Sequence, residues 1–132
     1  MRKTGEKITP VQLKDAVIRG MADKNGKNIA CLNMEKVNTS ICDFFVICEG
    51  TSSVQVNAIA EAVEEAVHKL TGQYAYHSEG HKNAEWILQD YVDVVVHIFQ
   101  PDVRSFYNLE KLWGDAELEE VLIETEYKRI KK

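Results

Sequence analysis

The chain of 132 residues has few cysteines and no long apolar run. Its three cysteines, Cys31, Cys42 and Cys48, are odd in number, lack CxxC spacing and lie in or beside apolar segments. Such cysteines are typical of buried free thiols in a reducing compartment, so neither a disulfide nor a zinc site is expected. Residues 1–10 lack the apolar core of a secretory signal, and no apolar run approaches the ~18 residues of a membrane span. We therefore expect a cytoplasmic protein.

The sequence also lacks an excess of positive charge. It has 16 Lys and Arg residues against 21 Asp and Glu residues, which gives a net charge of −5. Proteins that bind nucleic acid without sequence preference rely on a basic surface that displaces counterions from phosphate. An acidic chain finds a basic protein surface more readily. We therefore expect a protein partner, with no membrane and no direct sequence-specific contact with nucleic acid.

The chain has only two prolines, and each stands where a helix can begin. Apolar residues at helical spacing, together with capping residues, predict three helices, over 9–25, 52–71 and 101–113. In the third helix the residues expected to face the core are Val103, Phe106, Tyr107 and Leu109.

Strands are predicted where apolar residues are dense or alternate with polar ones, over 28–34, 40–50, 74–77, 85–91 and 93–99. The link between the last two is too short for a crossover helix, so these strands are expected to be antiparallel. The predicted fold class is α/β, a single domain with a mixed β-sheet of about five strands and flanking helices. We expect a flexible N-terminus over 1–8, the domain over 9–114, and a C-terminal extension over 115–132 that forms a loose amphipathic helix.

A cluster of possible metal ligands lies between the third and fourth predicted strands. The segment HSEGHKNAE holds His77, Glu79, His81 and Glu85. On a helix, His77 and His81 would share a face and could bind zinc. Gly80 lies between them and the neighbouring pattern is that of strand and loop, so a polar surface loop is the favoured interpretation. The alternative that stays open is a metal-dependent hydrolase built on His77, His81, Asp90 and His97.

The segment Gly50-Thr51-Ser52-Ser53 follows a predicted strand and precedes a predicted helix. Backbone N–H groups in this position can hold phosphate, and nucleotidyltransferases use a similar glycine-serine element. Those enzymes also need carboxylates that hold divalent metal. The acids that follow, Glu61, Glu64 and Glu65, are expected on the solvent face of the helix, and helix capping explains the serines. A nucleotidyltransferase that uses Ser52 stays open as a second alternative.

The last two predicted strands carry polar residues that core strands rarely hold. Asp90 and Asp93 flank a four-residue corner, where Asp is common because its side chain bonds to nearby backbone. His97 alternates with apolar residues and is expected to be packed and hydrogen-bonded rather than catalytic. Trp86, Leu88 and Asp90 share one side of their strand. That side is either plain core or a face that anchors a partner.

Taken together, these residues resemble the ribosomal silencing factor (Iojap-like) family, from about residue 13 to residue 116. The resemblance rests on an ordered set of short motifs, which are Asp43-Phe44-Phe45, Gly50-Thr51-Ser52, Glu79-Gly80, Trp86, Asp90, Asp93, His97, Arg104, Tyr107 and Leu112-Trp113. It implies a nucleotidyltransferase-like fold without the transferase active site. One position departs from the family pattern. Val92 stands where the family commonly has glycine, which predicts a differently shaped hairpin corner.

The resemblance also implies a function. Members of this family bind the large ribosomal subunit through its fourteenth protein, block joining with the small subunit and repress translation. It implies no enzymatic activity, cofactor or metal, and whether the apolar patch also forms a homodimer stays open. Trp86 and Leu88 would form the desolvated centre of the interface, and nearby carboxylates would meet Lys or Arg. The residues expected to bind the partner are Glu79, Trp86, Leu88, Asp90, Tyr91, Asp93 and His97.

Overall fold

The computed structural model describes residues 7–35, 37, 42–112 and 117–120. In chain order the elements within them are α1 (Pro10–Asp23), β1 (Lys27–Asn33), β2 (Phe44–Glu49), α2 (Ser53–Thr71), β3 (His77–Glu79), β4 (Trp86–Asp90), β5 (Val94–Phe99), α3 (Pro101–Tyr107), α4 (Leu109–Leu112) and β6 (Glu117–Glu120). The predicted helix end at 113–114, the predicted flexible residues 1–6 and the tail beyond residue 120 lie outside the described residues.

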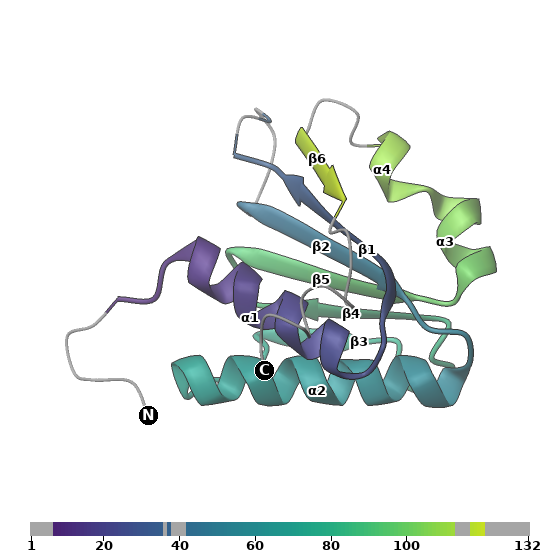
Figure 1. Cartoon of the computed structure of the whole chain (residues 1–132), viewed down its shortest axis with the longest axis horizontal. Coiled ribbons are helices and arrows are strands. Elements are labelled where there is room, and N and C mark those ends of the chain that lie inside the picture. Colours follow the sequence, from purple (N-terminus) through teal and green to yellow (C-terminus); the bar gives the residue numbers. More distant parts are fainter. Residues whose placement is uncertain (1–6, 36, 38–41, 113–116, 121–132) are drawn as a thin grey trace.

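The strands form one mixed sheet in the order β3-β4-β5-β2-β1-β6 (Figure 1). β2 and β5 pair in parallel, and the other neighbours pair antiparallel. The predictions of an α/β fold with a mixed sheet and of an antiparallel β4–β5 pair are therefore confirmed. The predicted helix over the tail is wrong for residues 117–120, which form a sixth strand on β1. An edge strand tolerates charged residues because only one of its edges is paired.

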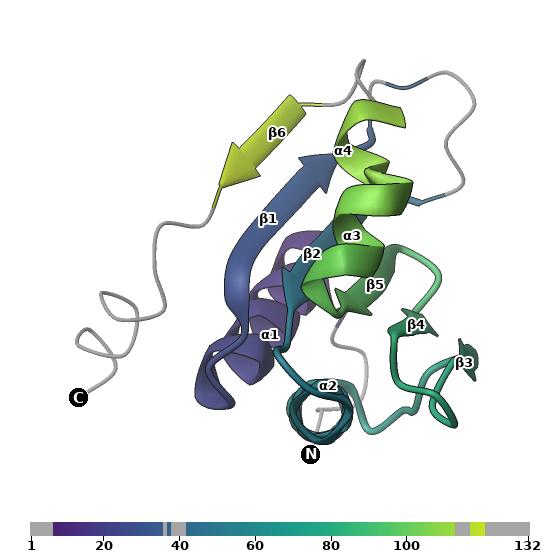
Figure 2. The ribbon, with the colours of Figure 1, turned by 90° about the vertical axis from the view of Figure 1, so that its right-hand side faces the viewer.

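The helices form a layer on each side of the sheet. α1 and α2 cover one face, whereas α3 and α4 lie against the other (Figure 2). In β2, Phe44, Val46 and Cys48 pack toward α1 and α2, and Phe45 and Ile47 point to the opposite side. Because β2 is buried on both faces, it is a continuous apolar run rather than an alternating one. The three cysteines are buried thiols that form no disulfide with one another, as predicted.

Short polar signals set the ends of α1 and α2. The Thr9 hydroxyl accepts a hydrogen bond from the Gln12 N–H at 3.1 Å, and the Gln12 side chain accepts one from the Thr9 N–H at 2.9 Å. This reciprocal pair satisfies two N–H groups that the first helical turn leaves free. Ser52 caps α2 by accepting from the Gln55 N–H at 3.1 Å. Gly72 ends α2 in the left-handed region at φ 76°, which glycine adopts without strain.

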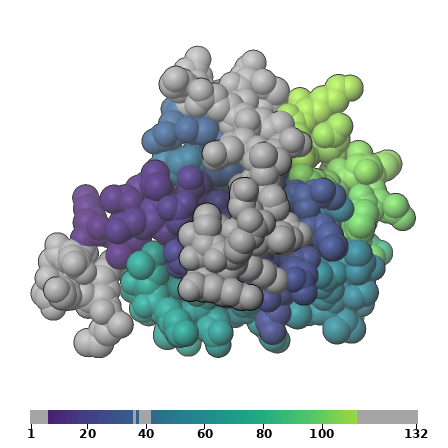
Figure 3. Space-filling view, in the orientation of Figure 1, coloured from purple at the N-terminus to yellow at the C-terminus, as the bar shows by residue number. Residues whose placement is uncertain are grey.

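α1 and α2 pack closely against each other at Gly20. A Cβ at this position would lie 2.7 Å from the Cα of Val63 in α2, so the approach requires glycine. Figure 3 shows the two helices side by side across this face of the molecule.

Among the described residues, no helix has both the length and the apolar character needed to cross a membrane.

Candidate functional site

Most of the candidate residues gather on the outer face of the sheet, by which we mean the face of β3, β4 and β5 turned away from α1 and α2. Strand register aligns side chains in rows across these three strands, and paired residues share a face. The rows are Glu79–Leu88–His97, His77–Asp90–Val95 and Trp86–Phe99. Five of the residues predicted to bind a partner therefore lie on one face, namely Glu79, Trp86, Leu88, Asp90 and His97.

Trp86 lies at the centre of an aromatic cluster on the outer face. Its ring centroid is 4.8 Å from that of Phe99 in β5 and 4.8 Å from that of Tyr107 in α3. The indole N–H donates a hydrogen bond to Nδ1 of His97, with 3.1 Å between the two nitrogens. Trp86 is only half-buried, so part of the indole stays open to a partner. A shallow pocket of about 230 Å³ adjoins it and is lined by Gly80, Lys82, Asn83, Glu85, Val103 and Tyr107.

His97 is buried beneath this cluster, with 4% of its surface exposed. Burial lowers its pKa to about 4, so the ring is neutral at pH 7. Because Nδ1 accepts the Trp86 proton, the proton of the imidazole itself lies on Nε2. Nε2 is buried and has no hydrogen-bond partner in the described part of the chain. Leaving such a donor unpaired costs roughly 1–3 kcal/mol.

This arrangement confirms the prediction that His97 is packed and hydrogen-bonded. It also means that His97 does not present a surface to a partner, although the sequence prediction grouped it with residues that do.

Residues 77–85 are polar and largely exposed, as the sequence favoured, but they are not loop throughout. His77–Glu79 forms β3, whereas the sequence predicted a strand over 74–77. His77, Glu79 and His81 are exposed, and Nε2 of His77 lies 2.6 Å from the carboxylate of Glu79. Within residues 7–35, 37, 42–112 and 117–120, no group of three or more His, Cys, Asp or Glu side chains could hold a metal ion. Gly80 has φ 94°, and a Cβ there would lie 2.0 Å from the carbonyl oxygen of Trp86. The turn is therefore packed directly onto the backbone of Trp86.

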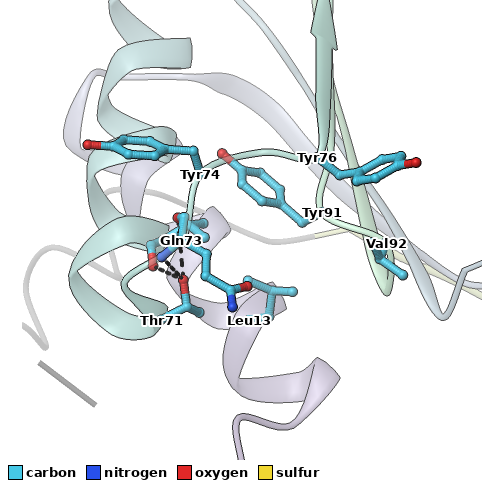
Figure 4. Close-up of a pocket in the computed structure, with 8 residues that line it drawn as sticks. Leu13, Thr71, Gln73, Tyr74, Tyr76, Tyr91 and Val92 are labelled. Atoms are coloured by element: carbon cyan, nitrogen blue, oxygen red, sulfur yellow. Dashed lines mark hydrogen bonds between the residues drawn. The ribbon is translucent and has the colours of Figure 1, made fainter.

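Tyr91 lies on the opposite side of the sheet from Trp86. It packs into the core under α1 and α2, so it does not join the other candidates on the outer face. Burial, and to a lesser extent the charge of Glu64, raises the pKa of its hydroxyl. That hydroxyl is buried without a hydrogen-bond partner among the described residues. Tyr91 lines a separate pocket of about 260 Å³ (Figure 4) together with Leu13, Val67, Thr71, Gln73, Tyr74, Tyr76 and Val92.

Three aspartates meet at the end of the sheet where β4 ends and β2 and β5 begin. The Asp43 N–H donates to the carbonyl of Asp93 at 2.8 Å, which ties the two strand starts together. The pKa of Asp43 is raised, mainly by partial desolvation and further by the negative charge of Asp93. The pKa of the Cys42 thiol is raised to about 12, mainly by burial and further by the negative charges of Asp43 and Asp90. This end of the sheet is therefore negative and favours Lys or Arg over phosphate.

The segment after β2 uses its serine and threonine to hold the start of α2. Besides the Ser52 cap, the Thr51 N–H donates to Oε1 of Gln55 at 2.7 Å. The Gln55 amide in turn donates to the carbonyls of Lys24 and Asn25, each at 3.2 Å, which ties α2 to the end of α1. Glu61 lies nine residues beyond Ser52, about 13 Å away along a helix that rises 1.5 Å per residue. These serine and threonine residues thus have a structural role as caps.

α3 contributes two aromatic residues that the sequence prediction placed in the core. Phe106 is 80% exposed and Tyr107 is 50% exposed, so that prediction is wrong for both. Leu109 is buried as predicted, and Val103 is half-buried. The reason is Asn108, which ends α3 after two turns at φ 45° and starts a new direction in α4. Asn tolerates the left-handed region better than most residues, so it is the signal that could have predicted this break.

Comparison with known proteins identifies the family. A family model described as "Ribosomal silencing factor during starvation" matches residues 7–132. Ribosomal silencing factor RsfS of Halalkalibacterium halodurans is 42% identical over 114 residues, which cover 84% of this chain and 96% of that protein. The protein of the same name from Bacillus subtilis is 46% identical over 96 residues, or 73% of this chain and 80% of that protein. The chloroplastic protein Iojap of Zea mays is 41% identical over 73 residues, which are 55% of this chain and 31% of that longer protein.

Solved structures agree with this assignment. A crystal structure of a protein from Chromobacterium violaceum has a TM-score of 0.75 at 36% identity, with 83% of this chain and 88% of that chain covered. A crystal structure of a protein from Bacillus halodurans has a TM-score of 0.72 at 37% identity, with 84% and 99% covered. The family model takes in the whole described sheet together with α3 and α4. The chain therefore belongs to the ribosomal silencing factor family.

Proposed function

We propose that this chain represses translation by occupancy: it binds the large ribosomal subunit and prevents the small subunit from joining. Its relatives are named for ribosomal silencing. The partner we propose is the fourteenth protein of the large subunit, which offers a basic surface on the face that meets the small subunit. The observation that carries the proposal is the outer face, where the half-buried Trp86 lies on the same strand face as Asp90. This action requires no covalent reaction, so we propose that the chain is not an enzyme.

The outer face has the composition of a binding surface. Aromatic residues dominate the energy of protein interfaces, and Trp86 and Tyr107 stand together here with Leu88 beside them. Carboxylates at Glu79 and Asp90 adjoin this apolar centre and would meet Lys or Arg side chains of a basic partner. Such charges contribute more to register and to the association rate than to raw affinity.

Repression by occupancy follows mass action. The fraction of large subunits held apart depends on the concentration of the repressor relative to its Kd. Repression requires an affinity high enough that subunit joining does not displace the repressor, and we propose that the Trp86 anchor and its charged rim supply it.

The test uses the double variant Trp86→Ala with Asp90→Arg. We expect its affinity for purified large subunits to fall about a hundredfold or more, since loss of a central tryptophan alone removes ~2 kcal/mol or more of binding energy. The measurement is co-sedimentation with large subunits, followed by sucrose-gradient profiles of large and small subunits mixed with each variant. The wild-type chain should leave free subunits, and the double variant should allow them to join.

The matched control is Tyr74→Ala with Glu61→Arg, which likewise replaces one aromatic residue with Ala and one acid with Arg, at exposed positions outside the outer face. It should bind and repress like the wild type. If the Trp86 variant sediments with large subunits at wild-type levels, the assignment of the surface is wrong. If the wild-type chain leaves subunit joining unaffected, the proposed function itself is wrong.

A further inference from the structure

His97 has a property that its burial alone does not explain. An aliphatic residue at this position would fill the space between Phe45 and Trp86 without burying an unpaired ring nitrogen of its own. His97 instead keeps Nε2 buried without a partner among the described residues. Its other ring nitrogen makes one hydrogen bond, to the indole of Trp86. An apolar side chain could also pack against Phe45 and Phe99, which the His97 ring contacts. Among the described residues, the contribution that requires an acceptor at position 97 is therefore the hydrogen bond that fixes the direction of the Trp86 ring.

We propose that His97 is a positioning residue of the outer face, which holds the Trp86 indole in the orientation that binds the partner and does not itself touch the partner. This inference rests on the proposed function, in which Trp86 is the central anchor. It assigns His97 a role different from that of the exposed residues on the same face.

The geometry supports a directional role. Ring contacts with Phe99 and Tyr107, at centroid distances of 4.8 Å each, hold the plane of the indole but discriminate weakly between its two edges. A hydrogen bond discriminates strongly, because only one edge of the indole carries the N–H. If the indole turned over, its N–H would leave the Nδ1 acceptor, and a second buried nitrogen would lose its partner. The bond of 3.1 Å thus selects one orientation before the partner arrives.

A side chain that is already fixed loses less conformational entropy on binding, and this smaller loss raises the affinity. Supporting contacts of this kind commonly decide whether a binding residue is merely present or correctly placed. The tight approach of Gly80 to the backbone of Trp86 fixes the main chain at the same point. His97 and Gly80 thus restrain the side chain and the backbone of one anchor residue.

The test compares two substitutions that separate the hydrogen bond from packing. In His97→Asn the side-chain oxygen takes the place of Nδ1 and can still accept the indole proton. In His97→Leu the space is filled but no acceptor remains, and the unpaired Nε2 is removed. We expect His97→Leu to unfold at the same or higher temperature than the wild type, yet to bind large subunits about two- to tenfold more weakly. His97→Asn should be less stable than His97→Leu but bind more tightly.

Two further measurements keep the inference testable if either variant folds poorly. The indole N–H resonance of Trp86 in ¹⁵N-labelled protein should move toward the value of a free indole in His97→Leu and stay near the wild-type value in His97→Asn. In a Trp86→Phe background, which has no indole N–H, adding His97→Leu should cause no further loss of affinity.

The inference is overturned if both His97 variants bind as tightly as the wild type, or if affinity follows thermal stability across the series. It is also overturned if His97→Leu weakens binding equally in the Trp86→Phe background. In each of these cases the wild-type chain still binds and Trp86→Ala with Asp90→Arg still does not, so the proposed function stands. Failure of the wild-type chain itself to bind overturns both.

Discussion

Val92 shows how a single residue can bear a conformation that its side chain disfavours. It has φ 73°, in the left-handed region, although it is β-branched. The corner forces this value, because the Val92 N–H donates to Oδ1 of Asp90 at 2.8 Å and the Tyr91 N–H donates to the carbonyl of Val94 at 2.9 Å. The sequence predicted a corner at Asp90–Asp93, and that prediction is confirmed. The resemblance predicted that valine in place of glycine would change the shape of this corner, yet the backbone of Val92 adopts a conformation suited to glycine.

Replacing Val92 with glycine should therefore stabilise the protein. We expect Val92→Gly to raise the free energy of unfolding by about 1 kcal/mol, since relief of left-handed strain exceeds the entropy that glycine adds to the unfolded chain. Little burial is lost, because Val92 is 58% exposed. The matched control is Val92→Ala, which removes the branched side chain but keeps Cβ, and it should recover only a small part of the gain. Urea unfolding measures both, and equal effects of the two substitutions would count against backbone strain.

His97 makes folding sensitive to mild acid. Its pKa is about 4 in the folded chain against 6.5 for an ordinary histidine. As the pH falls, His97 therefore becomes protonated near pH 6.5 in the unfolded chain but only near pH 4 in the folded chain. Stability from the neutral ring is complete above pH 6.5 and is lost as the pH falls from 6.5 to 4, by about 3 kcal/mol in total.

Between pH 7.5 and pH 5, we expect the wild-type chain to lose about 2 kcal/mol more free energy of unfolding than His97→Leu does. The leucine variant keeps every carboxylate, so the comparison isolates the histidine. Urea unfolding of the two proteins at both pH values gives this difference. Parallel pH profiles would mean that His97 is protonated as easily in the folded chain as in the unfolded one.

At the scale of elements, α3 is tied to its neighbours through the side chain of Arg104. Arg104 donates to Glu49 at the end of β2 at 3.1 Å, to Glu110 of α4 at 3.1 Å and to the carbonyl of Asn28 at 2.7 Å. Its side chain is only 11% exposed, and those of Glu49 and Glu110 are 16% and 22% exposed. Arg104 thus fastens a short helix, too short to be stable alone, onto two strands and the next helix.

Arg104→Ala should destabilise the protein by about 2–4 kcal/mol, because it leaves two mostly buried carboxylates close together without a cation. It should also weaken binding to large subunits, since Tyr107 of α3 is one of the rings that contact Trp86. Urea unfolding and co-sedimentation measure the two effects. The control is Arg19→Ala, an exposed arginine of α1, which should change neither. If Arg104→Ala unfolds at the same urea concentration as the wild type, the hydrogen bonds of Arg104 do not stabilise the protein.

The prediction of elements failed where a tertiary neighbour decided the outcome. Residues 117–120 lack a strong strand pattern and become a strand through pairing with β1. The third helix was predicted to continue to residue 113, but Asn108 divides it into α3 and α4. In contrast, the capped starts of α1 and α2 follow from neighbours within four residues, and those predictions are confirmed.

For the molecule as a whole, the sequence predicted which segments form strands better than which strands pair. The β4–β5 hairpin follows from its short corner. The parallel β2–β5 pair joins Phe44 to Val94, and no local pattern specifies such a pairing. The candidate site divides in the same way. Alternation along β4 places Trp86, Leu88 and Asp90 on one face, whereas Tyr107 reaches that face only through the packing of α3.

The parallel pairing of β2 with β5 also bears on how the protein is made. β5 is the penultimate strand of the described chain and lies between β4 and β2, so it completes both halves of the sheet. A nascent chain that ends before residue 94 contains every described element from α1 to β4, but it leaves one edge of β2 and one edge of β4 without the β5 neighbour. Such an incomplete sheet exposes apolar residues and unpaired backbone, which is when aggregation is most favoured. The two halves of the sheet therefore join only after β5 has left the ribosome, the particle whose activity the protein is proposed to restrain.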